Sequence, residues 1–214
     1  MNKQINISII DYGMGNLSSI NNIFSHFSCN VQIVSDYSEF KNSDAIVLPG
    51  VGAFGQAMKN LNKLNLIDDL KKIIIDKKIP TLGICLGMQL LADSSEENGF
   101  NKGLGLIPGK VEKIEVSQDL NLPHVGWNSI LKKEDNILFN NISNKSCFYF
   151  VHSFQYVCES KYVIATTDYE KDIIAAIRLD NIFGVQFHPE RSQSNGLKLI
   201  KNFLNLIDPN ININ

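Results

Sequence analysis

Residues 83–87, with the sequence Gly-Ile-Cys-Leu-Gly, constrain this chain more than any other stretch. The apolar run of residues 80–84 predicts a buried strand, and residues 86–92 predict the start of a helix. Cys85 then lies on a sharp strand-to-helix turn with a glycine two residues away on each side, as in a nucleophile elbow. The start of a helix favours a thiolate over a thiol and offers N–H groups to a developing oxyanion. A buried core cysteine is the alternative, but the motif favours a nucleophile.

A cysteine nucleophile needs a general base, and the base needs a third group to orient it. His188 follows the apolar run of residues 182–187, and the sequence His-Pro-Glu ends at Glu190. The proline ends strand pairing, and a carboxylate two residues after the histidine can hold one imidazole nitrogen. The other histidines are His26, in a helical pattern, and His124 and His152, in strand-like stretches. We therefore predict Cys85, His188 and Glu190 as a catalytic triad.

Composition limits the class of protein. A chain of 214 residues with 44% hydrophobic content can bury a core as one domain, which we expect over residues 1–207, followed by a polar tail over 208–214. The net charge of -2 gives no reason to expect nucleic-acid or membrane binding, and no apolar run approaches the roughly 18 residues of a membrane span. The N-terminus shows no signal pattern. Four cysteines without Cys-x-x-Cys spacing indicate neither a zinc site nor a disulfide framework. We expect a reduced, cytoplasmic protein.

The order of predicted elements gives the fold class. Predicted strands cover residues 5–10, 31–34, 45–48, 80–84, 111–116, 126–131, 148–157, 162–167, 173–179 and 182–187. Predicted helices cover residues 17–27, 196–207 and the segment that begins at residue 86. Alternating strands and helices in the first half favour βαβ crossovers, while the β-rich second half favours antiparallel pairing that returns His188 to the elbow. We predict an α/β fold, with a twisted, mostly parallel sheet flanked by helices and an antiparallel extension.

Two glycine-containing loops are open to more than one interpretation. Residues 50–55 fit Gly-x-Gly-x-x-Gly after a strand, the fingerprint of dinucleotide binding. That function also needs an acidic residue at the end of the next strand, and Asp68 and Asp69 lie in a helical stretch instead. The alternatives are an ordinary turn or a loop that presents backbone N–H groups to a substrate. Residues 11–16 form either a simple turn or a second loop beside the site.

Several stretches carry a resemblance to a known family. Residues 83–89 (Gly-Ile-Cys-Leu-Gly-Met-Gln) together with residues 186–190 (Gln-Phe-His-Pro-Glu) resemble the class I, triad-type glutamine amidotransferases. Residues 11–16, 49–52, 103–109, 123–128 and 149–153 are similar to the glutaminase subunits of imidazole glycerol phosphate synthase, a branch of that family. The resemblance runs from about residue 5 to about residue 206, and Pro-His-Val-Gly-Trp-Asn at 123–128 is its most specific part.

The resemblance implies a flavodoxin-like three-layer fold and hydrolysis of the side-chain amide of L-glutamine. Cys85 would attack the amide carbon, with no metal or organic cofactor required. Backbone N–H groups of Val51, Gly52 and Leu86 would form the oxyanion hole. The peptide at Val51, between two glycines, can reorient at low cost.

The substrate-binding residues implied are Gly52, Gln89, Glu97, His152, Ser153 and Phe154. Gln89 lies one helical turn after Cys85 and so faces the same side, although it could instead support the helix or a neighbouring residue. Glu97 would receive the substrate's ammonium group, or else be an ordinary solvated carboxylate. Two departures from the family pattern are Phe154, where tyrosine is frequent, and Asp-Tyr-Glu at 168–170 in place of a glycine-containing turn.

The ammonia needs an acceptor, so the resemblance implies a heterodimer with a synthase that receives ammonia through a channel. The expected partner is the cyclase subunit that makes imidazole glycerol phosphate in histidine biosynthesis, with aminoimidazole carboxamide ribotide (AICAR) as by-product. Trp127, Tyr149 and Arg191 would lie toward it, and a solvated surface charge is the alternative for Arg191. The competing functions are a paralogous glutaminase that serves another synthase, such as one that builds an amidino group on a sugar, a dinucleotide-binding oxidoreductase, and a non-catalytic scaffold.

Overall fold

A large sheet runs through the middle of the molecule in the computed structural model, which describes residues 4–117, 120–133 and 136–213. Over these residues nine strands take the order β2-β1-β3-β4-β13-β12-β11-β8-β9. Pairing is parallel from β2 to β13 and antiparallel from β13 to β9. The strands are β1 (Ile5–Ile10), β2 (Cys29–Val34), β3 (Ala45–Leu48), β4 (Thr81–Ile84), β8 (His124–Lys132), β9 (Cys147–His152), β11 (Val163–Tyr169), β12 (Lys171–Leu179) and β13 (Ile182–Val185). The predicted α/β fold, a sheet flanked by helices with an antiparallel extension, is confirmed, but the extension is larger than predicted: four pairings of this sheet are parallel and four are antiparallel.

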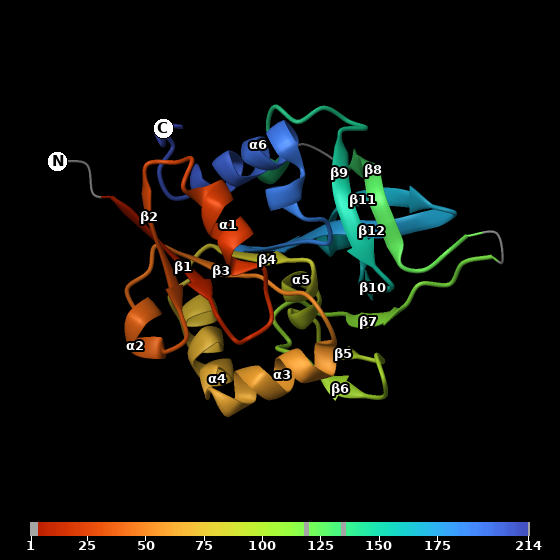
Figure 1. The fold of residues 1–214 in the computed structure, drawn as a ribbon, viewed down its shortest axis with the longest axis horizontal. Coiled ribbons are helices and arrows are strands. Elements are labelled where there is room, and N and C mark those ends of the chain that lie inside the picture. The colour runs from red at the N-terminus through yellow and green to blue at the C-terminus, as the bar shows by residue number, and fades with distance from the viewer. Residues whose placement is uncertain (1–3, 118–119, 134–135, 214) are drawn as a thin grey trace.

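Helices cover both faces of this sheet, as Figure 1 shows, with α1 and α6 on one side and α3, α4 and α5 on the other. They are α1 (Leu17–Phe24), α2 (Tyr37–Phe40), α3 (Phe54–Lys63), α4 (Leu66–Lys71), α5 (Leu86–Leu90) and α6 (Gln193–Leu204), with a π-helical segment η1 (Lys72–Asp76) after α4. Short 3-10 turns are η2 (Ile137–Phe139), η3 (Ser160–Tyr162) and η4 (Pro189–Arg191).

The two cores follow from the alternation of side chains along buried strands. In β3, Ala45 and Val47 belong to the core under α1 and α6, while Ile46 and Leu48 belong to the core under α3, α4 and α5. All four side chains are buried, so the strand reads as a continuous apolar run. The site forms where the carboxyl ends of β3, β4 and β13 meet one edge of the sheet.

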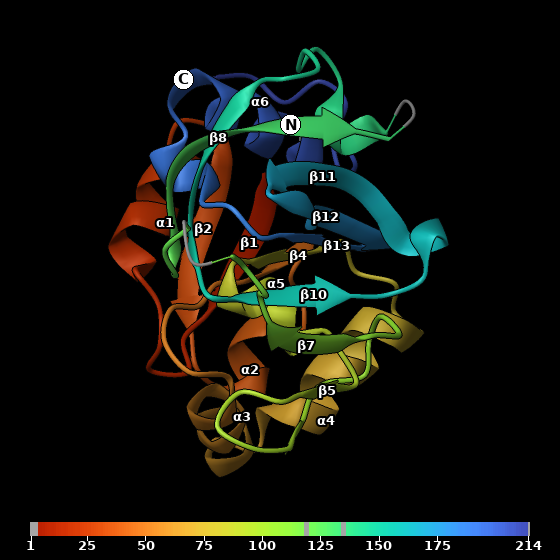
Figure 2. The same cartoon turned by 90° about the vertical axis from the view of Figure 1, so that its right-hand side faces the viewer.

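A second, four-stranded sheet packs beside the large one, with the order β10-β7-β5-β6 (Figure 2). Its strands are β5 (Ser94–Ser95), β6 (Asn101–Lys102), β7 (Lys110–Lys113) and β10 (Phe154–Val157). The single strand predicted over residues 148–157 is therefore wrong. The chain leaves β9 at His152 and enters the other sheet at Phe154, because the partner strands differ: β9 pairs with β8, and β10 pairs with β7.

Smaller differences concern the ends of helices and the C-terminus. The helix predicted over residues 17–27 ends at Phe24, yet Phe27 remains buried and so continues the apolar pattern beyond the helix. After α6 the chain returns to the start of β2, where Ile211 is buried and Phe27 pairs with Ile213. None of the helices described here is long and apolar enough to cross a membrane.

Candidate active site

Cys85 lies on the connection between β4 and α5 with a backbone φ of 53°, a conformation that side-chain-bearing residues rarely adopt. Its N–H donates to the Val185 carbonyl oxygen of β13 at 2.8 Å, which holds the turn on the sheet. A Cβ on Gly87 would clash with the Leu48 carbonyl oxygen, and one on Gly83 would lie 2.7 Å from the Gly87 oxygen. The elbow therefore requires both glycines, and the predicted geometry is present.

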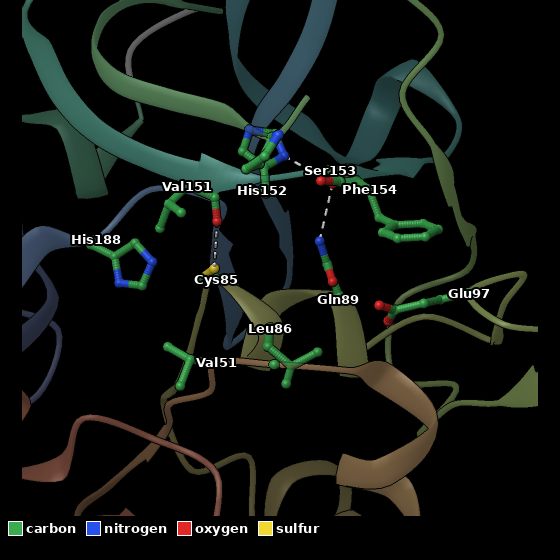
Figure 3. A pocket seen from close by; sticks show the side chains of 12 residues that line it. Val51, Cys85, Leu86, Gln89, Glu97, Val151, His152, Ser153, Phe154 and His188 are labelled. Carbon is green, nitrogen blue, oxygen red and sulfur yellow. Dashed lines mark hydrogen bonds between the residues drawn. The ribbon is translucent and has the colours of Figure 1, made fainter. Parts of the chain in front are cut away.

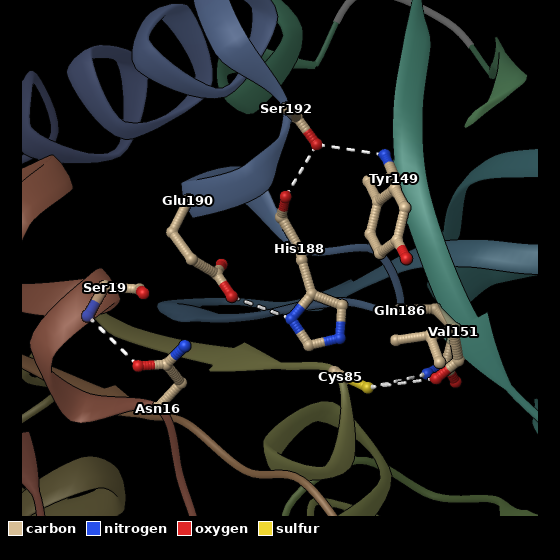
Figure 4. A network of polar contacts seen from close by, with 9 residues as sticks. All are labelled: Asn16, Ser19, Cys85, Tyr149, Val151, Gln186, His188, Glu190 and Ser192. Atoms are coloured by element: carbon tan, nitrogen blue, oxygen red, sulfur yellow. Dashed lines mark hydrogen bonds and ion pairs between the residues drawn. The ribbon is translucent and has the colours of Figure 1, made fainter. Parts of the chain in front are cut away.

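The predicted base and its orienting carboxylate are paired. His188 Nδ1–H donates to Glu190 Oε1 at 2.8 Å, and both side chains are almost completely buried (Figure 4). The His188 N–H donates to the Tyr149 carbonyl oxygen at 2.8 Å. Ser192, which sequence reasoning missed, fixes the same turn by donating its hydroxyl to the His188 carbonyl oxygen at 2.6 Å.

Cys85 and His188 lie in the same pocket but are not hydrogen-bonded to each other. Among the described residues, His188 Nε2 has no hydrogen-bond partner, whereas Cys85 Sγ lies 4.0 Å from the Val151 carbonyl oxygen and 3.7 Å from Gln186 Nε2. Burial lowers the pKa of His188, but the hydrogen bond to Glu190 and the negative charges of Cys85 and Glu190 raise it and prevail, to about 10. Since only the Glu190 contact has hydrogen-bond geometry, that carboxylate is the firmer cause. An imidazolium beside the sulfur favours a thiolate.

The predicted oxyanion loop lies over the elbow. Gly50 approaches it so closely that a Cβ there would lie 2.9 Å from Leu86 Cβ. The Val51 N–H, however, donates to the Met14 carbonyl oxygen at 3.4 Å, so one predicted oxyanion donor is engaged elsewhere. The N–H of Leu86, the first residue of α5, has no acceptor within its own helix.

The loop of residues 11–16 supports the oxyanion loop and does not line the main pocket. Tyr12 donates its hydroxyl to the Pro49 carbonyl oxygen, and burial raises the pKa of that hydroxyl. Asp68 and Asp69 lie in α4, as expected, and not at a strand end. The dinucleotide fingerprint thus lacks its acidic partner at that position.

A cavity of about 370 Å³ opens at Cys85 and His188. Figure 3 shows Cys85 between His188 on one side and Gln89 and Glu97 on the other. The cavity lining includes all the predicted substrate and oxyanion residues: Val51, Gly52, Leu86, Gln89, Glu97, His152, Ser153 and Phe154. Pro123 and Val151 also line it and were not predicted, although both lie within the stretches that carried the resemblance.

Gln89 and Glu97 are both fixed by the protein. Gln89 Nε2 donates to the Phe154 carbonyl oxygen at 3.1 Å and to Gln186 Oε1 at 3.0 Å, so this residue braces the pocket wall as well as lining it. Glu97 Oε2 accepts the Phe54 N–H at 2.7 Å at the start of α3. The carboxylate is therefore held at the pocket and is not freely solvated.

Two buried histidines are in contact here: His152 lines the cavity and His124 lies behind it, and sequence reasoning gave them no joint role. His152 Nδ1–H must donate to the Phe154 carbonyl oxygen, 2.8 Å away, since a carbonyl only accepts. His152 Nε2 then accepts from His124 Nδ1–H at 3.0 Å, and His124 Nε2 accepts from Asn128 Nδ2 at 3.2 Å. Burial lowers the pKa of both histidines to about 4, so both are neutral.

The residues predicted at a partner surface lie together. The Trp127 and Tyr149 rings are 6.0 Å apart between centroids, and the Arg191 guanidinium lies 4.3 Å from the Tyr149 ring centroid. Trp127 is 49% exposed and Val125 is 55% exposed, which is high for large apolar side chains. The Tyr149 ring is also 6.5 Å from the His188 ring, so this surface adjoins the candidate triad.

The turn at residues 168–170, which departs from the family's glycine-containing pattern, is formed by Glu170 in a left-handed conformation. Glu170 joins β11 to β12 with a φ of 66°, the region that glycine adopts most easily. Its carboxylate accepts the Ser117 N–H at 2.8 Å. The turn forms without glycine, and it lies away from the cavity lining.

The α/β fold, the cysteine on a strained elbow and the adjoining pocket are typical of enzymes that use a cysteine nucleophile. The family model for class-I glutamine amidotransferases matches residues 8–206. The chain therefore belongs to the class-I glutamine amidotransferase family, and the predicted glutaminase class of enzyme is confirmed.

The curated relatives are more specific. The chain is 48% identical to imidazole glycerol phosphate synthase subunit HisH 2 of Vibrio vulnificus, over 94% of each chain. It is 44% identical to subunit HisH of Pelagibacter ubique, over 94% of this chain and all of that one. It is 46% identical to subunit HisH 2 of Methanococcus maripaludis, over 92% and 98%. The predicted resemblance to this branch of the family is confirmed.

Solved structures support the fold alone, because their sequences are distant. PurLQS of Thermotoga maritima aligns with a TM-score of 0.75 at 18% identity, over 96% of this chain and 100% of that one. A glutamine amidotransferase of Thermotoga maritima aligns with a TM-score of 0.63, also at 18% identity, over 96% and 86%.

Proposed function

We propose that this chain hydrolyses the side-chain amide of L-glutamine and delivers the ammonia to a cyclase subunit that makes imidazole glycerol phosphate in histidine biosynthesis. One observation carries the proposal: a single cavity brings the strained Cys85, the buried His188 and the predicted glutamine contacts together. The similarity to HisH subunits over nearly the full chain supports the pathway.

The first half of the reaction makes a thioester. The Cys85 thiolate attacks the amide carbon, and the oxyanion accepts the N–H of Leu86 and of the loop at Val51 and Gly52. His188 gives its proton to the departing nitrogen, and Glu190 keeps the imidazole in the orientation that this requires. Ammonia leaves, and the glutamyl group remains on the sulfur.

Substrate recognition follows from groups that the protein has already fixed. Both N–H bonds of Gln89 Nε2 are used, so its oxygen is the atom available to a donor of the substrate. Glu97 keeps Oε1 for the substrate ammonium group while Oε2 holds α3. Charge pairing of this kind is strongest in a pocket that excludes water.

The proposed partner docks on the surface of Val125, Trp127, Tyr149 and Arg191. Exposed aromatic and apolar side chains with a nearby arginine are typical of interface centres. Docking there would cover the candidate triad from one side, which suits transfer of ammonia without loss to solvent. Arg191 could pair with a partner carboxylate in two-point contact.

We further infer that the partner completes the oxyanion hole. The Val51 N–H is bonded to Met14 over a long 3.4 Å contact, a weak bond that a small shift of the glycine-flanked peptide can exchange. The isolated chain should thus hydrolyse glutamine poorly until a ligand-loaded partner favours the reoriented peptide.

The test measures glutamate release by the chain alone, with the cyclase subunit, and with the cyclase subunit plus imidazole glycerol phosphate. We expect the rate to rise in that order, and Arg191→Ala to reduce the response, whereas the matched Arg178→Ala should not. Full activity in the isolated chain would contradict gating, and an unchanged response in Arg191→Ala would remove that residue from it.

A paralogous glutaminase that serves another synthase is the second candidate, because the class-I family model that matches residues 8–206 does not specify which synthase receives the ammonia. Failure of the cyclase to stimulate an otherwise active glutaminase would favour it.

A further inference from the structure

Gln186 is a fully buried amide beside the nucleophile, and the reaction described above does not use it. It follows β13 and precedes His188 by two residues, with 0% of its surface exposed. Its N–H donates to the Ala175 carbonyl oxygen of β12 at 2.9 Å, so its backbone is fixed to the sheet. A buried amide is costly unless its polar atoms are hydrogen-bonded. Gln186 is therefore held there by its contacts.

The orientation of its amide follows from a carbonyl that can only accept. Gln89 must turn Nε2 toward the Phe154 carbonyl oxygen, 3.1 Å away, and the second hydrogen of that nitrogen reaches Gln186 at 3.0 Å. Gln186 must then present Oε1 to Gln89. Its Nε2 consequently faces Cys85 Sγ at 3.7 Å, within the range of an N–H···S hydrogen bond.

We propose that Gln186 is a further catalytic residue, whose Nε2–H donates to Cys85 Sγ and stabilises the thiolate. A hydrogen bond to a charged acceptor is roughly twice as strong as one between neutral groups, so the bond favours S⁻ over S–H. Figure 4 shows Gln186 and the Val151 carbonyl converging on Sγ from the side away from His188. The sulfur is thus held between an amide donor and the base.

The same bond serves the second half of the reaction. Water attacks the thioester carbon while His188 takes its proton, and the C–S bond then breaks with its electron pair left on sulfur. Glutamate leaves as the acid, which releases its proton to solvent, and the imidazolium and thiolate are restored together. Gln186 Nε2–H donates to the sulfur as that negative charge returns, so it stabilises the leaving group of this step.

Gln89 connects this donor to the substrate pocket. It lines the cavity, whereas Gln186 does not, and one nitrogen joins the pocket wall at Phe154 to Gln186. A substrate glutamine that binds against Gln89 would therefore also restrain the Gln186 amide, which faces the sulfur. This inference rests on the proposed function, because it takes Cys85 as the nucleophile.

The experiment follows alkylation of Cys85 by iodoacetamide from pH 5 to 9, resolved by peptide mass spectrometry from the other three cysteines. Gln186→Met removes the donor and should slow alkylation about tenfold near neutral pH by moving the profile to higher pH. Gln186→Glu keeps an acceptor for Gln89 and places a carboxyl group against the sulfur; once that buried carboxyl ionises, toward pH 9, alkylation should be slower still. The control is Asn202→Leu, which removes another buried amide, one bonded to the Leu138 and Asn140 carbonyls of a different region.

Glutaminase turnover of the complex with the cyclase subunit gives the second measurement. For Gln186→Glu we expect kcat to fall at least tenfold while KM for glutamine changes by less than about threefold, since Gln89 keeps its partner. Wild-type alkylation profiles in both folded variants would overturn the proposal, as would Gln186→Glu reacting faster than Gln186→Met at pH 9. Absence of wild-type turnover would instead count against the proposed function, because alkylation does not depend on a partner or a substrate.

Discussion

The two carboxylate oxygens of Glu190 have different surroundings. Oε1 accepts His188 Nδ1–H at 2.8 Å, while Oε2 is buried and has no hydrogen-bond partner among the described residues. A carboxylate buried in this way is stabilised chiefly by the charge that its neighbour carries. In the proposed triad, Glu190 would therefore stabilise the charge of the imidazolium as well as orient the ring.

We expect His188→Ala to lower kcat of the complex about 1000-fold without unfolding the chain, because it removes the base that serves both half-reactions. Glu190→Gln keeps an oxygen for Nδ1–H but loses the charge, so it should lower kcat by about tenfold to 100-fold. The exposed Glu159 supplies the control Glu159→Gln. A wild-type rate in Glu190→Gln would remove that residue from the triad.

At Glu97 the predicted contact with substrate and a structural contact share one side chain. Glu97→Gln keeps an acceptor for the Phe54 N–H, so the free energy of unfolding should stay within about 0.5 kcal/mol, while KM for glutamine rises about tenfold because the charge is lost. Glu97→Ala should lose both and destabilise by about 1 kcal/mol. Urea unfolding and steady-state kinetics separate the two effects. An unchanged KM in Glu97→Gln would assign this carboxylate to α3 alone.

At the scale of elements, the elbow depends on how closely β4, α5 and the end of β3 approach one another. The helix α5 has only five residues, so stabilisation of negative charge at its start comes from nearby N–H groups rather than from a long helix dipole. The approach is set by Gly87 against the Leu48 carbonyl. The geometry of the nucleophile is thus a packing property of three elements.

Gly87→Ala should therefore destabilise the chain by about 3 kcal/mol and abolish turnover, because backbone on both sides must shift. Gly15→Ala is the matched control, since a Cβ there would meet only side chains at ordinary contact distance. Thermal unfolding and soluble yield compare the variants. Normal stability in Gly87→Ala would mean that the elbow is less tightly packed than the structure describes.

The cross-strand pair His124 and His152 of β8 and β9 predicts how stability depends on pH. Burial lowers both pKa values to about 4, whereas unfolded histidines titrate near 6.5. Between these values the unfolded chain binds more protons, so the free energy of unfolding should fall as pH drops from 6.5 to 4. His124→Gln should make this decline shallower, and the exposed His26→Gln should not. Equal slopes in His124→Gln and wild type, measured by urea unfolding, would contradict the neutral pair.

Elements with a clear local periodicity could be predicted from the sequence. The ends of a strand were predicted less well where they depend on which strand it pairs with. β1 and β3 have the predicted bounds, and the elbow, His188 and Glu190 lie in recognisable motifs. The break at Ser153 could not be predicted, because apolar alternation continues through it while the strands change sheets. The contacts of Gln186, His124 and Ser192 near the site were missed, since each is made with a residue distant in sequence.

For the molecule as a whole, the arrangement of the two sheets places the cavity next to the proposed partner surface. The cavity at Cys85 lies at the carboxyl edge of the parallel strands, bounded by the second sheet through Phe154 and by the antiparallel extension through Val151. The exposed Trp127 and the half-buried Tyr149 continue from that extension beside His188. Ammonia produced at Cys85 therefore arises next to the proposed partner surface, which is where an acceptor could use it.

The central claim is that Cys85 releases ammonia from glutamine and takes no part in the synthesis that uses the ammonia. The most direct measurement is synthesis of imidazole glycerol phosphate by the complex of Cys85→Ala with the cyclase subunit, once with glutamine and once with ammonium salt. We predict that glutamine-dependent synthesis is lost, because no other group attacks the amide, while ammonia-dependent synthesis stays at the wild-type rate. Cys147→Ala, which removes an exposed cysteine, should keep both activities. Retained glutamine-dependent synthesis in Cys85→Ala, or loss of both activities in a complex that still assembles, would contradict the claim.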